Sequence, residues 1–220
     1  MSARRSIPLE QAAEVSKEPR WPGAVAVVSV GLLNLFLPAS LSAGPGWLAV
    51  GVVAGLAISA LLIERWHVWL GHAAAAVATF ELGYSLWVLV TDLTEHRGHP
   101  TDILRAALLL WSMNVIVFAC WYWRLDAGGP SRRSRHEVYC GGAFLFPYLT
   151  LSRERCRELG VEDWRPQFID YLFLAFNTST AFSPTDVPVL SAWAKVLMMT
   201  QASIALVTLA MVAARAVNIL

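Results

Sequence analysis

Hydroxyl, amide and carboxyl side chains gather in one ten-residue stretch near the C-terminus, Asn177-Thr178-Ser179-Thr180-Ala181-Phe182-Ser183-Pro184-Thr185-Asp186. Oxygen atoms of this kind can replace part of the hydration shell of a cation. Thr178, Ser179, Thr180 and Ser183 would supply hydroxyls, and Asp186 would form a ring of negative charge if several copies surrounded one axis. These residues therefore predict a path for a monovalent cation or a proton.

The segments on either side of this stretch differ in length. Residues 168–176 are apolar but too short to cross a hydrocarbon core of about 30 Å at 1.5 Å per residue, whereas residues 191–217 are long enough. Irregular backbone at membrane depth is tolerated only where it is buried in protein or lines a water-filled cavity. The pattern predicts a re-entrant half-helix that is followed by the last span.

Residues 166–220, about a quarter of the chain, resemble the pore module of tetrameric cation channels. The run Thr178-Ser179-Thr180 matches the threonine-rich end of such a pore helix, and Asp186 lies near the acidic residue that follows the filter. The resemblance makes residues 103–123 the outer helix and implies a homo-oligomer around a pore. Residues 182–184 stand where a potassium filter has glycines, so the usual potassium selectivity is not implied.

The whole arrangement also resembles a bacterial family of uncharacterised membrane proteins. The matching residues are Phe146-Pro147, Asp170-Tyr171-Leu172-Phe173 and Thr185-Asp186. That family has four spans, a loop, a short half-helix and a last span, and it carries no settled activity. The resemblance implies a location in a bacterial inner membrane.

The composition predicts an all-α integral membrane protein. Hydrophobic residues make up 56% of the 220 positions and charged residues only 15%, with a mean hydropathy of +0.52. We expect five transmembrane helices, at about 21–41, 47–63, 68–90, 103–123 and 191–217, plus the half-helix. The chain would then divide into a polar tail (1–20), a four-span region (21–123), an arginine-rich loop (124–165) and the channel-like part (166–220).

The distribution of arginines predicts the orientation. The tail and the 124–165 loop are both rich in arginine, and four predicted spans separate them, so both would lie in the cytoplasm. Cys140 and Cys156 would then stay reduced, although they could pair if the loop faced an oxidising compartment. The apolar island at 143–147 is predicted to lie on the membrane surface.

Four polar residues fall inside the predicted apolar elements. Glu81 is a candidate for a proton-linked site, because an ionisable residue inside a bilayer is costly, and Asn114 and Gln201 are its candidate partners. A neutral Glu81 that is hydrogen-bonded for packing fits equally well. Asp170 is interpreted as a cap at the start of the half-helix, with a place on the ion path as the alternative.

Other functional classes find little support. The net charge of +1 and the lack of a basic tract with interleaved aromatic residues argue against nucleic acid. The pairs His67/His72 and His96/His99 would lie on opposite membrane faces, so no metal site is predicted, and no cofactor or catalytic motif is found. The alternative to a cation channel is a non-conducting scaffold or accessory subunit that uses the half-helix for packing, and an enzyme ranks third.

Overall fold

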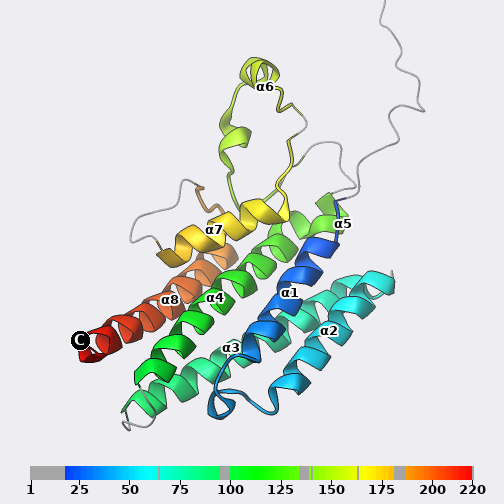
Figure 1. Ribbon diagram of the computed structural model, residues 1–220. Helices are drawn as coiled ribbons and strands as arrows, with labels where there is room; N and C mark the ends of the chain where they lie inside the picture. The colour runs from blue at the N-terminus through cyan, green and yellow to red at the C-terminus, as the bar shows by residue number, and fades with distance from the viewer. Residues whose placement is uncertain are drawn as a thin grey trace, which may run out of the picture.

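The computed structural model describes residues 18–63, 65–94, 100–133, 139, 141–162, 164–180 and 187–219. In these residues the chain is helical, and its only β feature is an isolated antiparallel bridge between Phe144 and Val189. The longer helices lie side by side in a bundle (Figure 1). They are α1 (Trp21–Asn34), α2 (Gly46–Leu62), α3 (His67–Thr94), α4 (Pro100–Leu125) and α8 (Ala192–Ile219).

Helix α4 is the centre of the bundle. It packs against α1, α3, α7 and α8, and 61% of its most apolar stretch is buried in the protein, against 22% for α8. Leu110, Met113 and Tyr122 on α4 are fully buried. The outer helices leave large apolar side chains exposed, Trp69 and Trp87 on α3 among them. Apolar side chains on the outside of an apolar bundle fit a lipid environment better than water.

Three helices in the described part are long and apolar enough to cross a membrane, within His67–Asp92, Thr101–Arg133 and Ala192–Ala214. These ranges contain the predicted spans 68–90 and 103–123 and cover most of 191–217. Helices α1 and α2 have only 14 and 17 residues, or about 21 and 26 Å at 1.5 Å per residue. The membrane-embedded character is therefore supported. Helix α1 is shorter than the predicted span 21–41, whereas α2 has the length predicted for 47–63.

The first predicted span, 21–41, is helical only as far as Asn34. Beyond it the backbone tightens, with amides bonding three residues back up to Leu37, and Pro38 precedes the short 3-10 helix η1 (Ala39–Leu41). Proline cannot donate a helical hydrogen bond and disfavours a helical conformation in the residue before it. The segment with η1 continues along α3 instead.

Helix α7 (Phe168–Thr180) runs antiparallel to α4 and covers only half of it. Near its start, the rings of Phe168 and Trp123 are 5.7 Å apart. Near its end, the indole Nε1 of Trp111 donates to the carbonyl of Ser179 over 3.4 Å. Twelve helical residues on α4 separate these contacts, about 18 Å of rise.

After α7 the described chain resumes at the level where α7 began. The amide of Leu145 donates to the carbonyl of Pro188 over 2.9 Å, and the amide of Leu190 donates to the carbonyl of Ala143 over 2.8 Å. Helix α8 then starts beside the end of α4 and runs in the same direction as α7.

The predicted 124–165 loop contains four short helices, η2 (Asp126–Gly128), α5 (Pro130–Arg133), η3 (Pro147–Thr150) and α6 (Arg153–Leu159). Helix α6 projects beyond the end of the bundle (Figure 1). Ser152 caps its N-terminus, and Gly160 ends it with a φ of +65°, a conformation that suits glycine. Cys140 lies outside the described residues, so its pairing with Cys156 stays open.

The apolar island at 143–147 is not a surface patch, which corrects the prediction. Phe144 is 1% and Phe146 3% exposed. The ring of Phe144 contacts the rings of Tyr122, Tyr171 and Trp193 at 5.2–6.2 Å. A short apolar run cannot show by itself whether lipid or protein covers it, and here the ends of three helices do.

Candidate functional site

Helix α7 begins with the cap that the sequence predicted for Asp170. Its carboxylate accepts a hydrogen bond from the backbone amide of Gln167 over 2.7 Å. A side chain at the third helical position that bonds back to the cap residue forms half of a capping box. The negative charge of the same carboxylate also interacts favourably with the positive N-terminal end of the helix dipole. Its alternative role on an ion path stays a prediction.

The hydroxyls at the other end of α7 bond to protein backbone. Thr178 Oγ1 donates to the carbonyl of Leu174 over 2.8 Å, and Thr180 Oγ1 donates to the carbonyl of Phe176 over 3.0 Å. Such back-bonding is common for threonine in membrane helices and leaves the oxygen lone pairs available. Thr180 is exposed and Thr178 half-buried, whereas Ser179 is buried between helices.

Gln201 of α8 binds the end of α7 to the bundle. Its side-chain amide donates to the carbonyl of Ala175 over 2.7 Å and to Ser179 Oγ over 2.8 Å. Its side-chain carbonyl accepts from the hydroxyl of Tyr122 on α4. The Gln201 side chain is fully buried, so all three helices meet at this one amide.

Asn114 completes this cluster from α4. Its amide nitrogen donates to the backbone carbonyl of Gln201 over 3.2 Å, and its side-chain oxygen has no partner among the described residues. The sequence proposed Asn114 and Gln201 as partners of Glu81, and that pairing is wrong. The two residues bind each other, because α4 turns this face toward α8 and not toward α3.

Glu81 lies at the middle of α3 in a smaller cluster. Asn34, the last residue of α1, donates to Glu81 Oε2 over 3.2 Å, and Ser42 donates to Asn34 Oδ1 over 2.9 Å. Glu81 is half-buried. The carboxyl thus joins the end of α1 to α3, an arrangement that fits the packing role at least as well as a proton path.

Two of the predicted ion-path residues, Ser183 and Asp186, lie outside the described residues. The structure therefore describes the part of the predicted path at Thr178, Ser179 and Thr180, and the rest of that path lies outside the described residues. Of the predicted path residues that the structure describes, Ser179 is buried in the contact between α7 and α8. The side chains of Thr178 and Thr180 are partly exposed.

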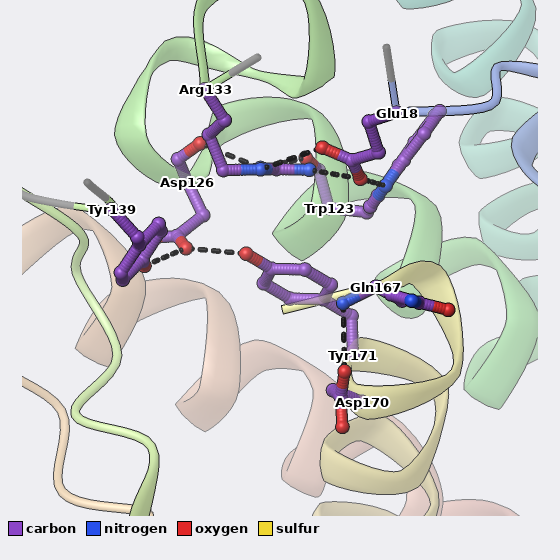
Figure 2. Close-up of polar contacts among 8 residues, drawn as sticks. All are labelled: Glu18, Trp123, Asp126, Arg133, Tyr139, Gln167, Asp170 and Tyr171. Atoms are coloured by element: carbon purple, nitrogen blue, oxygen red, sulfur yellow. Dashed lines mark hydrogen bonds and ion pairs between the residues drawn. The ribbon is translucent and has the colours of Figure 1, made fainter. Parts of the chain in front are cut away.

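A second buried polar cluster, centred on Asp126, was not predicted from the sequence. Asp126 follows α4 directly and is fully buried. Its carboxylate accepts from the hydroxyls of Tyr139 and Tyr171 (Figure 2). It also accepts from the backbone amide of Ala143 over 2.6 Å. Burial first, and then the Asp126 charge, raise the pKa of Tyr139, so its hydroxyl remains a donor.

Arg133 adds a positive charge to this cluster. Its guanidinium donates to the carbonyls of Trp123 and Asp126, each over 2.8 Å, and forms an ion pair with Glu18 over 2.8 Å (Figure 2). The two paired side chains are 3% and 14% exposed. Glu18 also accepts from the indole of Trp123. The end of α4 is thereby tied to the chain that precedes α1.

Few features of the sequence indicate the Asp126 cluster. Asp126 reads as an ordinary loop residue, and its partners follow 13 and 45 positions later. Arg133 belongs to an arginine run that indicates topology. The one local signal is Gly142, where a Cβ atom would overlap the Tyr139 hydroxyl.

Comparisons with protein-family models, with curated proteins and with solved structures find no match. The geometry alone therefore indicates what the site can do. The described part of the chain holds no group of three metal-ligating side chains. It does hold the C-terminal end of a half-length helix, with hydroxyls and carbonyls, halfway along α4. A helix C-terminus is the negative end of the helix dipole and favours cations.

Proposed function

We propose that the protein passes a monovalent cation or a proton across a membrane through an oligomeric, channel-like path. In this proposal α1, α2, α3, α4 and α8 span the membrane, and α7 is a re-entrant half-helix. The arginine-rich segment and the N-terminus lie in the cytoplasm, where positive charge accumulates. The path runs along Thr178, Thr180, Ser183 and Asp186.

The observation that carries this proposal is the position along α4 at which α7 ends. The helix starts beside Trp123 and ends beside Trp111, about 18 Å along α4, which is close to half of a 30 Å hydrocarbon core. An interrupted helix directs its dipole and its last carbonyls at a point inside the membrane. Transporters and channels use such ends to hold ions.

An ion path also needs several copies, because one bundle offers no axis beside α7. The outer face of α7 is apolar and exposed: Ile169, Phe173 and Phe176 are 62, 60 and 46% exposed. Helix α8 exposes Val196 and Met199 on its own outer face. Neighbouring subunits in a ring would cover such faces, and α7 and α8 would then surround the pore.

The scaffold alternative rests on a specific observation. Ser179 is buried against Gln201, and the Thr178 and Thr180 hydroxyls bond to their own helix. A half-helix held in this way can serve to pack the bundle without conducting. Oligomeric state separates the two: a rotational axis beside residues 178–186 favours a pore, and a monomer with that loop buried favours a scaffold.

Ion flux into liposomes tests conduction directly. Purified wild-type protein is compared with Asp186→Asn, Thr180→Ala and the control Thr200→Val, whose exposed hydroxyl on α8 bonds only to its own helix. We expect wild-type flux to fall several-fold in the first two variants and to persist in the control. Absence of flux from folded wild-type protein at several pH values and potentials would contradict conduction and favour the non-conducting scaffold.

A further inference from the structure

A cavity of about 390 Å³ opens where α4 ends and α8 begins. Its wall is formed by the segment after α4 and by the first residues of α8, and includes Arg132, Arg133, Tyr139, Gly141, Ser191 and Trp193. It is separate from the predicted ion path, which starts from the far end of α7. The wall combines cationic, hydroxyl and aromatic groups.

Among the described residues that line this cavity, the charged ones are two arginines, Arg132 and Arg133. The Arg133 guanidinium donates its hydrogen bonds to Glu18 and to the carbonyls of Trp123 and Asp126. Arg132 is exposed, and its side chain makes no hydrogen bond or ion pair within the described part of the chain. The carboxylates of Glu18 and Asp126 do not line the cavity, and Arg133 is paired with Glu18, so Arg132 is the lining arginine whose guanidinium is left for a ligand.

Ser191 adds a hydroxyl with no partner. Its Oγ is buried and forms no hydrogen bond with any described residue, and Ser191 is one of the residues that line the cavity. A buried hydroxyl without a partner costs free energy that a bound ligand can recover. Ser191 also immediately precedes α8, a helix of 28 residues, whose first amides lack helical partners and favour anions.

The position of the cavity indicates the chemistry of its ligand. It lies at the end of the bundle that carries the arginine-rich segment, and Leu125 and Trp193 contribute apolar surface to its wall. Tryptophan side chains prefer the headgroup level of a membrane. Basic pockets at this level of membrane proteins bind anionic lipid headgroups.

We propose that this cavity binds a phosphate group, held by the Arg132 guanidinium, the Ser191 hydroxyl and the first amides of α8. The phosphodiester of an anionic phospholipid and a free phosphate share this chemistry. The site does not depend on conduction, and it would exist equally in a pore or in a scaffold.

Binding of three probes to the full-length protein in neutral detergent tests the site. Dioctanoyl phosphatidylglycerol carries the phosphodiester, dioctanoylglycerol has the same chains without phosphate, and inorganic phosphate has no chains. Native mass spectrometry counts the bound lipid, and calorimetry gives the affinity for inorganic phosphate. We expect one phosphatidylglycerol to bind and dioctanoylglycerol to bind at least about tenfold more weakly, because charge-assisted hydrogen bonds are lost.

Variants locate the binding. Arg132→Gln should weaken phosphatidylglycerol binding about tenfold and Ser191→Ala about fivefold. The control Arg155→Gln removes one exposed charge from α6 and should leave binding unchanged. Unchanged unfolding temperatures would show that the variants are folded, as expected for the exposed Arg132.

Each outcome bears on the proposal. Inorganic phosphate that binds as tightly as phosphatidylglycerol, with the same response to the variants, supports the site and identifies a soluble ligand. Binding of the lipid alone supports the site and identifies the membrane as its source. Equal binding of dioctanoylglycerol, or an equal loss in Arg155→Gln, would overturn it, since the first shows chain binding and the second a diffuse charge effect.

Discussion

Helix α7 is held at its two ends by clusters of opposite character. Its start contacts the Asp126 cluster, where carboxylates and a guanidinium are buried together beyond the end of α4. Its end contacts the Gln201 cluster, where amides and hydroxyls meet between α4, α7 and α8. Charged groups thus lie at one end of the bundle, and neutral groups lie halfway along it.

The difference follows from the cost of burying charge. An ion inside a hydrocarbon core is expensive even when it is paired, whereas an amide recovers most of its cost through hydrogen bonds. At the end of the bundle the ion pair is nearly as buried, but its two partners are also hydrogen-bonded to the end of α4, which offsets part of the cost of burying them. The start of α7 should therefore depend on charge and its end on geometry.

The largest expected effect is at the charged cluster. Arg133→Met should lower the free energy of unfolding by about 3–5 kcal/mol, because Glu18 would be left buried without its counter-charge. Unfolding in mixed micelles with increasing dodecyl sulfate measures it. The control is Arg155→Met, whose ion pair with Glu158 is 60% and 63% exposed and should be worth under about 1 kcal/mol. An equal decrease in the free energy of unfolding in the two variants would show that the start of α7 does not depend on the buried charges.

Gln201→Leu tests the neutral cluster and should cost about 1–3 kcal/mol. The substitution keeps the volume but leaves the Ser179 and Tyr122 hydroxyls and the Ala175 carbonyl without their partner. Unfolding in the same micelles measures it, with Thr200→Val as the neighbouring exposed control. A loss as large as that of Arg133→Met would show that the two clusters do not differ as proposed.

Tyr139→Phe should cost about 1–2 kcal/mol near neutral pH, since it removes one hydrogen bond to a carboxylate. The folded pKa of Tyr139 is raised by burial and by Asp126. The hydroxyl therefore contributes its full stability below its unfolded pKa of about 10 and loses it as pH rises further.

Unfolding at pH 8 and at pH 10.5 checks this dependence on pH. The difference between wild type and Tyr139→Phe should shrink at the higher pH. A difference that stays constant would mean that Tyr139 does not donate to Asp126.

Glu81→Gln should have the smallest effect on stability, within about 0.5 kcal/mol, because glutamine retains the oxygen that accepts from Asn34. Glu81 places a carboxyl midway along a helix, at a depth where the Gln201 cluster has only neutral groups. If the protein conducts, unchanged dependence of flux on pH would assign Glu81 to packing, and a shifted dependence would assign it to proton coupling.

Much of the fold follows from local patterns. Apolar runs predicted α3, α4 and α8, and the short run at 168–176 predicted a helix too short to span. The cap at Asp170 was also predictable, because it depends on residues three positions apart. The end of α1 was predicted less well, since apolar side chains continue from Asn34, where the helix stops, past Pro38.

The pairing of polar residues was not predictable in this way. Gln201 looked like a partner for Glu81 by depth and type, but it faces Ser179. Asp126 meets hydroxyls from positions 139 and 171 only after the chain has folded back over the end of α4.

The amino-acid sequence by itself determined that this chain is helical and suited to a membrane, and where α7 begins. Those properties depend on hydropathy and on contacts within one or two helical turns. The tertiary structure alone decided that α7 ends beside the middle of α4, which polar groups it meets there, and that two arginines line a cavity. These depend on the rotation and depth of every helix relative to its neighbours, which only the packing of the whole bundle sets.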